Sequence, residues 1–162
     1  DAVQSKSIID FLIDVITEIR SIRSELRVAP SNKTKLLVLN DGHDYLDVLI
    51  ENNIKIQRMA RVSTIEYTDA IPDHAIQFSI SGVGFGLDLD GVVNAEEELT
   101  RLDKELSKIL DDLAVVNKKL ENKQFLDNAP HDVIEKQRAI REELSNQKNE
   151  LEISKRKLMK LS

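Results

Sequence analysis

Six basic side chains gather within a short part of the last third of the chain. They are Lys118, Lys119, Lys123, Lys136, Arg138 and Arg141. Lysine and arginine bind phosphate groups, so a polynucleotide backbone is the ligand that such a group would take. The alternative is a solvated helix surface, in which these charges pair with acidic neighbours three or four residues away. A steep fall of RNA affinity with salt would favour phosphate contacts, and a flat salt response would favour the solvated surface.

A second basic group lies near the end of the first predicted helix, at Arg20, Arg23 and Arg27. One interpretation is that these charges complement the negative end of the helix dipole. The other is that they contact RNA phosphates. Arg20 and Arg23 are therefore further candidate RNA-binding residues.

Residue types used in catalysis are present without catalytic spacing. The chain has no cysteine, which excludes thiolate chemistry. Its three histidines lie far apart in the sequence: His43, His74 and His131. Asp88 and Asp90 flank a predicted turn with no His, Ser or Lys partner indicated nearby, so turn formation explains them better than acid–base catalysis. We predict no catalytic residues, no metal site and no cofactor site in this chain.

Three glycines, Gly82, Gly84 and Gly86, have a spacing that invites comparison with a phosphate-binding loop. Such a loop must lead into a helix whose N-terminus faces the anion. Here residues 87–91 continue a strand into a turn instead. We therefore predict a tight hairpin and a bent strand rather than a nucleotide site.

Two long stripes of mainly apolar residues predict the helices that position the first basic group. Steps of three and four residues separate Leu99, Leu102, Leu106, Ile109, Leu113, Val116 and Leu120. The same steps separate Val133, Gln137, Ile140, Leu144, Gln147, Leu151, Ser154, Leu158 and Leu161. This heptad pattern predicts an antiparallel two-helix coiled-coil hairpin, with helices at about 94–122 and 130–161 that each reach about 40 Å. Leu120 is expected near Val133, and Leu99 near Leu158 or Leu161.

Local signals mark the ends of these two helices. Asn94 with Glu97 three residues later resembles a capping box, and Pro130 suits the first turn of the returning helix. The connection Glu121–Asp132 is polar and turn-like. Phe125 in this connection either closes the end of the hairpin as a hydrophobic plug or packs against an exposed base.

The chain before residue 94 predicts a small mixed α/β domain. A helix over Ser7–Arg27, stopped by Pro30, buries one stripe: Leu12, Val15, Ile19, Ile22 and Leu26. A second helix over Asp44–Ala60 has five inner candidates: Leu46, Leu49, Ile50, Ile56 and Met59. Strands are predicted at 35–40, 62–67, 75–81 and 83–89. The fold class is therefore α+β: a helix and a β-α-β-β-β unit, followed by the hairpin.

Composition sets outer bounds on function. The net charge of the chain is −6. Residues 1–93 carry 9 basic and 14 acidic side chains, whereas residues 94–162 carry 14 basic and 15 acidic side chains. A nearly neutral rod can still carry a basic end. No apolar run approaches the roughly 20 residues of a membrane span, and the first residues do not form a signal peptide, so we expect a cytoplasmic protein without membrane contact. The first residue is Asp rather than Met, which suggests a piece of a longer chain.

Three stretches carry a resemblance to a known family. Residues 16–25 with Pro30, residues 87–106, and residues 119–138 resemble the C-terminal end of valyl-tRNA synthetases, in the same order and with similar spacing. The third stretch is the most specific, because Asn122 and Phe125 before Ala129-Pro130 are similar to the family's turn between two arm helices. The resemblance covers nearly the whole chain.

This resemblance implies the tail of a class I aminoacyl-tRNA synthetase, which uses ATP and Mg to join valine to tRNA(Val). It implies three parts: residues 1–30 as the last helix of the anticodon-binding domain, 31–93 as a small α/β linker domain, and 94–162 as a coiled-coil arm that clamps the outer corner of tRNA. The family's catalytic motifs, His-x-Gly-His and Lys-Met-Ser-Lys-Ser, are absent from this sequence. The chain alone is thus not expected to be an enzyme, although its parent is, and the parent is expected to be monomeric. The alternative is a structural coiled-coil hairpin that mediates protein–protein interaction or dimerisation.

Overall fold

The computed structural model describes residues 2–161, with side chains from Ser7 onward. Two compact units make up this part of the chain. The sheet unit holds the residues up to Ala95 together with Lys160 and Leu161, and the hairpin unit holds Glu96–Met159. Within the described residues, no helix combines the length and the apolarity that crossing a bilayer needs.

The sheet unit begins with helix α1, Ala2–Glu25, which starts earlier than predicted. All five residues of its predicted stripe are buried. The helix ends before Pro30, because Arg27 adopts a left-handed conformation with φ of 53°. The N–H groups of Arg27 and Val28 then donate to the carbonyls of Ser24 and Arg23, at 3.2 and 2.9 Å. This pattern satisfies the last carbonyls of the helix and turns the chain toward the sheet.

Four strands form a mixed sheet in the order β2-β1-β4-β3. The strands are β1 (Thr34–Leu39), β2 (Val62–Thr68), β3 (Ile76–Ile80) and β4 (Val83–Asp88). β1 is parallel to β2 and antiparallel to β4, and β3 and β4 form a hairpin. Ser81 and Gly82 make the turn of this hairpin with φ of 51° and 80°. Two positive φ values match the twist of the flanking strands, so the predicted tight hairpin is confirmed.

The predicted helix over Asp44–Ala60 is wrong in one respect, because it is two helices. α2 covers Leu46–Glu51 and α3 covers Asn53–Ala60, with a break at Asn52. The Asn52 backbone departs from helical geometry, with φ of −108° and ψ of 14°, and its side chain donates to the Val48 carbonyl at 2.8 Å. Leu49 and Ile56 are buried as predicted, whereas Ile50 and Met59 are half exposed, contrary to prediction.

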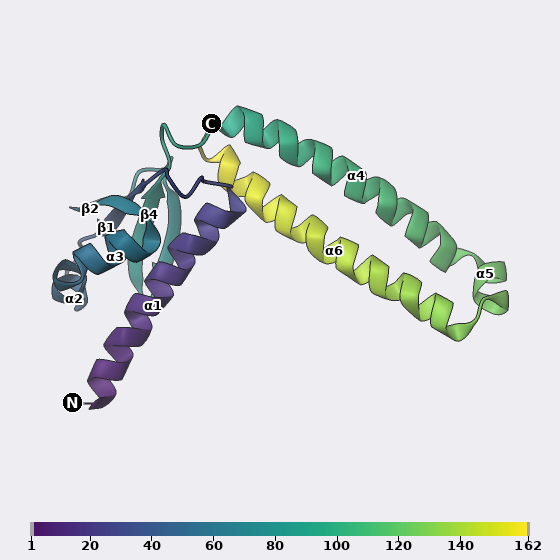
Figure 1. Ribbon diagram of the computed structural model, residues 1–162, viewed down its shortest axis with the longest axis horizontal. Helices are drawn as coiled ribbons and strands as arrows, with labels where there is room; N and C mark the ends of the chain where they lie inside the picture. Colours follow the sequence, from purple (N-terminus) through teal and green to yellow (C-terminus); the bar gives the residue numbers. More distant parts are fainter. Residues whose placement is uncertain (1, 162) are drawn as a thin grey trace. The chain divides into compact units, whose positions relative to one another are not determined.

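The core of the sheet unit lies on one face of the sheet. Figure 1 shows α1 in front of the strands, and α1 contacts both α3 and β3 while α3 contacts β2. At the centre, the Phe85 ring stacks on Phe78 with centroids 5.0 Å apart and lies 6.4 Å from Phe11. On the other face, a Cβ at Gly86 would lie only 2.6 Å from the Ile71 side chain. Glycine at this position therefore lets the chain around Ile71 cover the second face closely.

The hairpin unit consists of α4 (Ala95–Glu121), α5 (Lys123–Asn128) and α6 (His131–Met159). Figure 1 shows α4 and α6 running side by side in opposite directions, with α5 at the turn between them. The buried residues of α4 belong to the predicted stripe: Leu102, Leu106, Leu113, Val116 and Leu120. On α6 they are Ile134, Ser154 and Leu158. An ion pair of 2.8 Å between Lys155 and Asp103 links the two helices as well.

The start of α6 differs from the prediction by one residue. Val133 was expected beside Leu120, but Val133 is 39% exposed whereas Ile134 is 8% exposed. Ile134 forms a buried cluster with Val116 and Leu120. Pro130 explains the shift, because its carbonyl accepts from the N–H groups of both Val133 and Ile134 and sets the phase of the first turn.

This difference predicts unequal effects of two neighbouring substitutions. Ile134→Ala is expected to lower the free energy of unfolding of the hairpin unit by about 2 kcal/mol, because it removes buried methyl groups. Val133→Ala is expected to change it by less than about 0.5 kcal/mol. Urea denaturation followed by helical circular dichroism measures both. A larger loss in Val133→Ala than in Ile134→Ala would mean that α4 and α6 pack in the phase predicted from sequence, with Val133 buried.

Candidate nucleic-acid interface

The end of the hairpin is built around a small apolar cluster. Val116, Leu120 and Ile134 form its buried centre, and Phe125 packs against them. Four more partly buried side chains pack against the same centre: Leu126, Ala129, Ile140 and Leu144. The side-chain oxygen of Asn122 accepts from the N–H of Gln124 at 2.9 Å and of Phe125 at 3.4 Å, which starts α5. Phe125 is therefore the hydrophobic plug, and the competing contact with a base is not needed to explain it. Sequence reasoning missed α5, although Asn122 is a residue type that favours helix starts.

The structure brings the six predicted basic residues to this end of the hairpin. We call residues 118–141 the hairpin tip. Lys118 and Lys119 lie on α4, Lys123 lies on α5, and the remaining three on α6, namely Lys136, Arg138 and Arg141. All six are exposed. The tip therefore presents its positive charges to solvent from three helices.

One of the six is already paired within its own helix. Arg138 Nη1 lies 2.7 Å from Glu135 Oε1, in a pair that is about half exposed on both sides. Among the described residues, the other five have no carboxylate within 4 Å. Among the described residues, Arg138 is thus the one member of the six with the internal pair that the solvated-surface interpretation predicts.

Charge varies along the hairpin unit. The tip has six basic and four acidic side chains, a net charge of +2, whereas residues 96–117 have three basic and seven acidic ones, a net charge of −4. In that acidic part, Arg101 lies 2.8 Å from Glu98 and also binds Glu105. Burial acts to lower the pKa of Arg101, but the hydrogen bonds and charges of Glu98 and Glu105 outweigh it and raise this pKa. A polyanion would therefore be attracted to the tip and repelled along the first part of α4.

The two candidates on α1 have different environments. Arg20 is exposed. Arg23 is only 6% exposed, and its guanidinium donates to the carbonyls of Ala29 and Arg61 at 3.0 and 3.4 Å. Burial, and then the nearby charge of Arg61, lower the pKa of Arg23. Arg23 is thus an internal donor for carbonyls at the end of α1, and the structure corrects its assignment as a phosphate contact.

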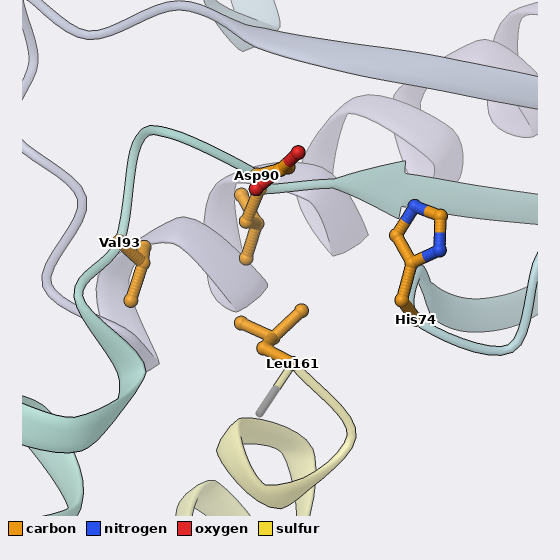
Figure 2. Close-up of a pocket in the computed structure, with 5 residues that line it drawn as sticks. His74, Asp90, Val93 and Leu161 are labelled. Atoms are coloured by element: carbon orange, nitrogen blue, oxygen red, sulfur yellow. The ribbon is translucent and has the colours of Figure 1, made fainter.

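A second correction concerns Asp88, for which no histidine partner was expected. His74 Nε2 lies 3.6 Å from Asp88 Oδ2, and the other Asp88 oxygen accepts from the Asp90 N–H at 3.0 Å. The second bond is the turn interaction that the sequence predicted. Figure 2 shows the adjacent pocket of about 200 Å³, where His74 and Asp90 lie near apolar side chains. These are Leu89, Val93 and Leu161.

The described residues contain no group of three or more His, Asp or Glu side chains placed to hold a metal ion. What they do contain is a pair of long antiparallel helices with an exposed positive end. The fold and this surface together define a class of protein: a helical arm suited to docking a polyanion.

Comparison with known proteins is consistent with this class. Residues 94–161 match the family described as the valyl tRNA synthetase tRNA binding arm. A valine–tRNA ligase of Bradyrhizobium diazoefficiens is 37% identical over 134 residues, which are 83% of this chain and 14% of that protein. One of Nitratidesulfovibrio vulgaris is 41% identical over 141 residues (85% and 16%), and one of Geobacter sulfurreducens is 33% identical over 156 residues (94% and 18%).

The chain therefore belongs to the valyl-tRNA synthetase family and contains that family's arm region. It spans between 14% and 18% of the length of these relatives. The arm match begins at residue 94, where the sequence predicted the hairpin to begin.

Proposed function

We propose that this chain is the tRNA-binding C-terminal region of a valine–tRNA ligase, and that the hairpin tip holds the outer corner of tRNA(Val). The observation that carries the proposal is the exposed tip, where five cations from three helices have no carboxylate partner among the described residues. The match of residues 94–161 to a tRNA-binding arm family supports the same ligand. Protein–protein interaction or dimerisation is not favoured, because the relatives are tRNA ligases.

The hairpin suits RNA because duplex RNA is recognised mainly through its shape, its 2′-hydroxyls and its phosphates. A rod of two helices packed as an antiparallel coiled coil offers a surface that keeps its spacing when it binds. The heptad steps and the buried stripe of α4 support that packing. Lys118, Lys119 and Lys123 are the primary contacts in this proposal, with Lys136 and Arg141 beside them. Arg138 contributes less because Glu135 already neutralises part of its charge.

The remainder of the parent enzyme supplies the chemistry in this proposal. ATP, Mg and valine bind to a catalytic domain outside these residues, and the parent acts as a monomer in the cytoplasm. Residues 1–30 form the last helix of the anticodon-binding domain, residues 31–93 a linker domain, and residues 94–162 the arm. Arg20, which is exposed on α1, is a secondary candidate for RNA contact.

Charge reversal at two neighbouring positions tests the role of the tip. Lys118→Glu/Lys119→Glu is expected to weaken binding of tRNA(Val) by about 10- to 30-fold, because two phosphate contacts become repulsive. The slope of log affinity against log salt should become shallower by roughly 1.5. Filter binding of the 162-residue chain to transcribed tRNA(Val) over a salt series measures both quantities.

The matched control is Lys104→Glu/Lys108→Glu. These two lysines are also exposed on α4, and the substitutions change the net charge by the same amount. They lie outside the tip, so the expected loss is under about threefold. Equal losses in the two variants would mean that net charge alone explains the binding, and would contradict the assignment of the tip as the binding site.

A further inference from the structure

A second basic surface lies in the sheet unit, at the junction of α3 with β2. It is a pocket of about 370 Å³ that receives side chains from three segments of the chain. Lys33 comes from the loop before β1, Arg58 from α3, and Arg61 from the residue after α3. The other lining residues are Ile54, Gln57, Val62 and Ser63. We call Lys33, Arg58 and Arg61 the basic triad.

The charges of the basic triad are not compensated locally. All three side chains are exposed, and among the described residues none has a carboxylate within 4 Å. Lys35, which is close in sequence, differs because it pairs with Glu66 at 3.0 Å. Residues 1–93 have 9 basic and 14 acidic side chains, so three unpaired cations around one pocket are not a consequence of a general positive excess.

A buried arginine adds to the positive charge of this region. Arg23 donates to the Arg61 carbonyl at 3.4 Å and to Thr34 Oγ1 at 3.5 Å, so its charge lies just inside the wall of the pocket. The acceptors of its described hydrogen bonds are neutral. A buried cation without a carboxylate partner raises the affinity of its surroundings for an external anion.

The wall of the pocket is held by specific contacts. Arg61 has a left-handed conformation with φ of 56°, and its N–H donates to the Gln57 carbonyl at the end of α3. The Gln57 side chain donates to the Ser63 carbonyl at 3.3 Å, and Ser63 Oγ donates to the Thr34 carbonyl at 3.2 Å. Arg58 and Arg61 also complement the negative end of α3. That role does not account for Lys33, which comes from a different segment.

We propose that the basic triad binds a backbone phosphate of the same tRNA that the hairpin tip binds, which gives the chain a second phosphate site. This inference rests on the proposed function and adds a contact surface in the sheet unit. A phosphate suits the pocket because two guanidinium groups and an ammonium group can share its oxygens, with the neutral side chains of Gln57 and Ser63 beside them. Base edges would need acceptors and donors in a fixed pattern, so we expect the contact to be independent of sequence.

The test is Lys33→Glu/Arg58→Glu in the 162-residue chain, with transcribed tRNA(Val) as the probe. We expect about tenfold weaker binding and a salt slope shallower by roughly 1.5. Lys104→Glu/Lys108→Glu, with the same change of charge outside both sites, is expected to change affinity by less than about threefold. Phosphate ethylation interference gives a second measurement. In Lys33→Glu/Arg58→Glu, ethylation should cease to interfere at one set of phosphates, and this set should differ from the set that is lost in Lys118→Glu/Lys119→Glu.

A milder variant protects the test against misfolding. Lys33→Gln/Arg58→Gln removes the charges without reversing them, and we expect roughly threefold weaker binding with the tyrosine fluorescence of the sheet unit unchanged. Wild-type affinity and salt slope in both triad variants, with weak binding in the tip variant, would overturn the second site and leave the proposed function intact. Failure of the wild-type chain to bind tRNA(Val) would overturn both proposals.

Discussion

Phe85→Ala is expected to lower the free energy of unfolding of the sheet unit by about 3 to 5 kcal/mol. The Phe85 side chain is 1% exposed, and its ring lies 5.0 Å from that of Phe78 and 6.4 Å from that of Phe11. Its removal leaves a cavity at the point where α1 packs on β4. The stack of Phe11 on Tyr45, with centroids 4.1 Å apart, should loosen as a consequence.

The tyrosines provide a selective measurement of this effect. The chain has two tyrosines, Tyr45 and Tyr67, and no tryptophan, so tyrosine fluorescence during urea denaturation reports on the sheet unit. Phe125→Ala is the matched control, because it deletes the same side chain from the hairpin unit. It should leave the tyrosine transition unchanged. A similar shift in both variants would mean that the two units unfold as one.

Leu102→Ala is expected to destabilise the hairpin unit by about 2 to 4 kcal/mol. Leu102 is 1% exposed within a seam that is only two helices wide, so little surrounding structure can relax into the space. Leu158 on α6 is equally buried. Because a two-helix hairpin has few buried residues to spare, the loss should raise amide hydrogen exchange along α4 and α6.

Leu110→Ala is the control for this prediction, since it makes the same chemical change in the same helix. Leu110 is 48% exposed, so its truncation should change stability by less than about 0.5 kcal/mol. Leu102→Ala should also weaken tRNA binding without changing any charge, because the tip lysines lose their fixed spacing. Similar exchange rates in the Leu102 and Leu110 variants would contradict the seam that the structure describes.

The two long helices could be predicted because their signals are local. The steps of three and four residues place an apolar stripe on each helix whatever surrounds it, and the polar stretch from residue 121 to 132 gives the point of reversal. The places of five of the six basic residues followed from the same argument, since they fall between stripe positions, whereas Lys123 lies on α5, which the pattern did not predict. The strand and turn over residues 81–88 were predicted for a similar reason, because alternation and Gly82 define a hairpin over a few residues.

Other features depend on contacts that a linear pattern does not contain. The first turn of α6 begins at Pro130, and there Ile134 rather than Val133 is buried. The break at Asn52 coincides with a side-chain hydrogen bond to the Val48 carbonyl, and the continuous helical periodicity of the sequence conceals it. Arg23 has the sequence environment of a surface arginine, yet the end of α1 folds over it and gives it three acceptors.

By itself, the sequence determined the α+β class, the two long helices and which cations they carry, because each of these depends on residue type and on spacing within one segment. Only the tertiary structure decided which of the cations remain free for a ligand. It buried Arg23, paired Arg138, and brought Lys33 together with Arg58 and Arg61, which follow it by 25 and 28 positions in the sequence. The physical reason is that burial and charge pairing depend on neighbours in space, and these neighbours come from segments far apart in the chain.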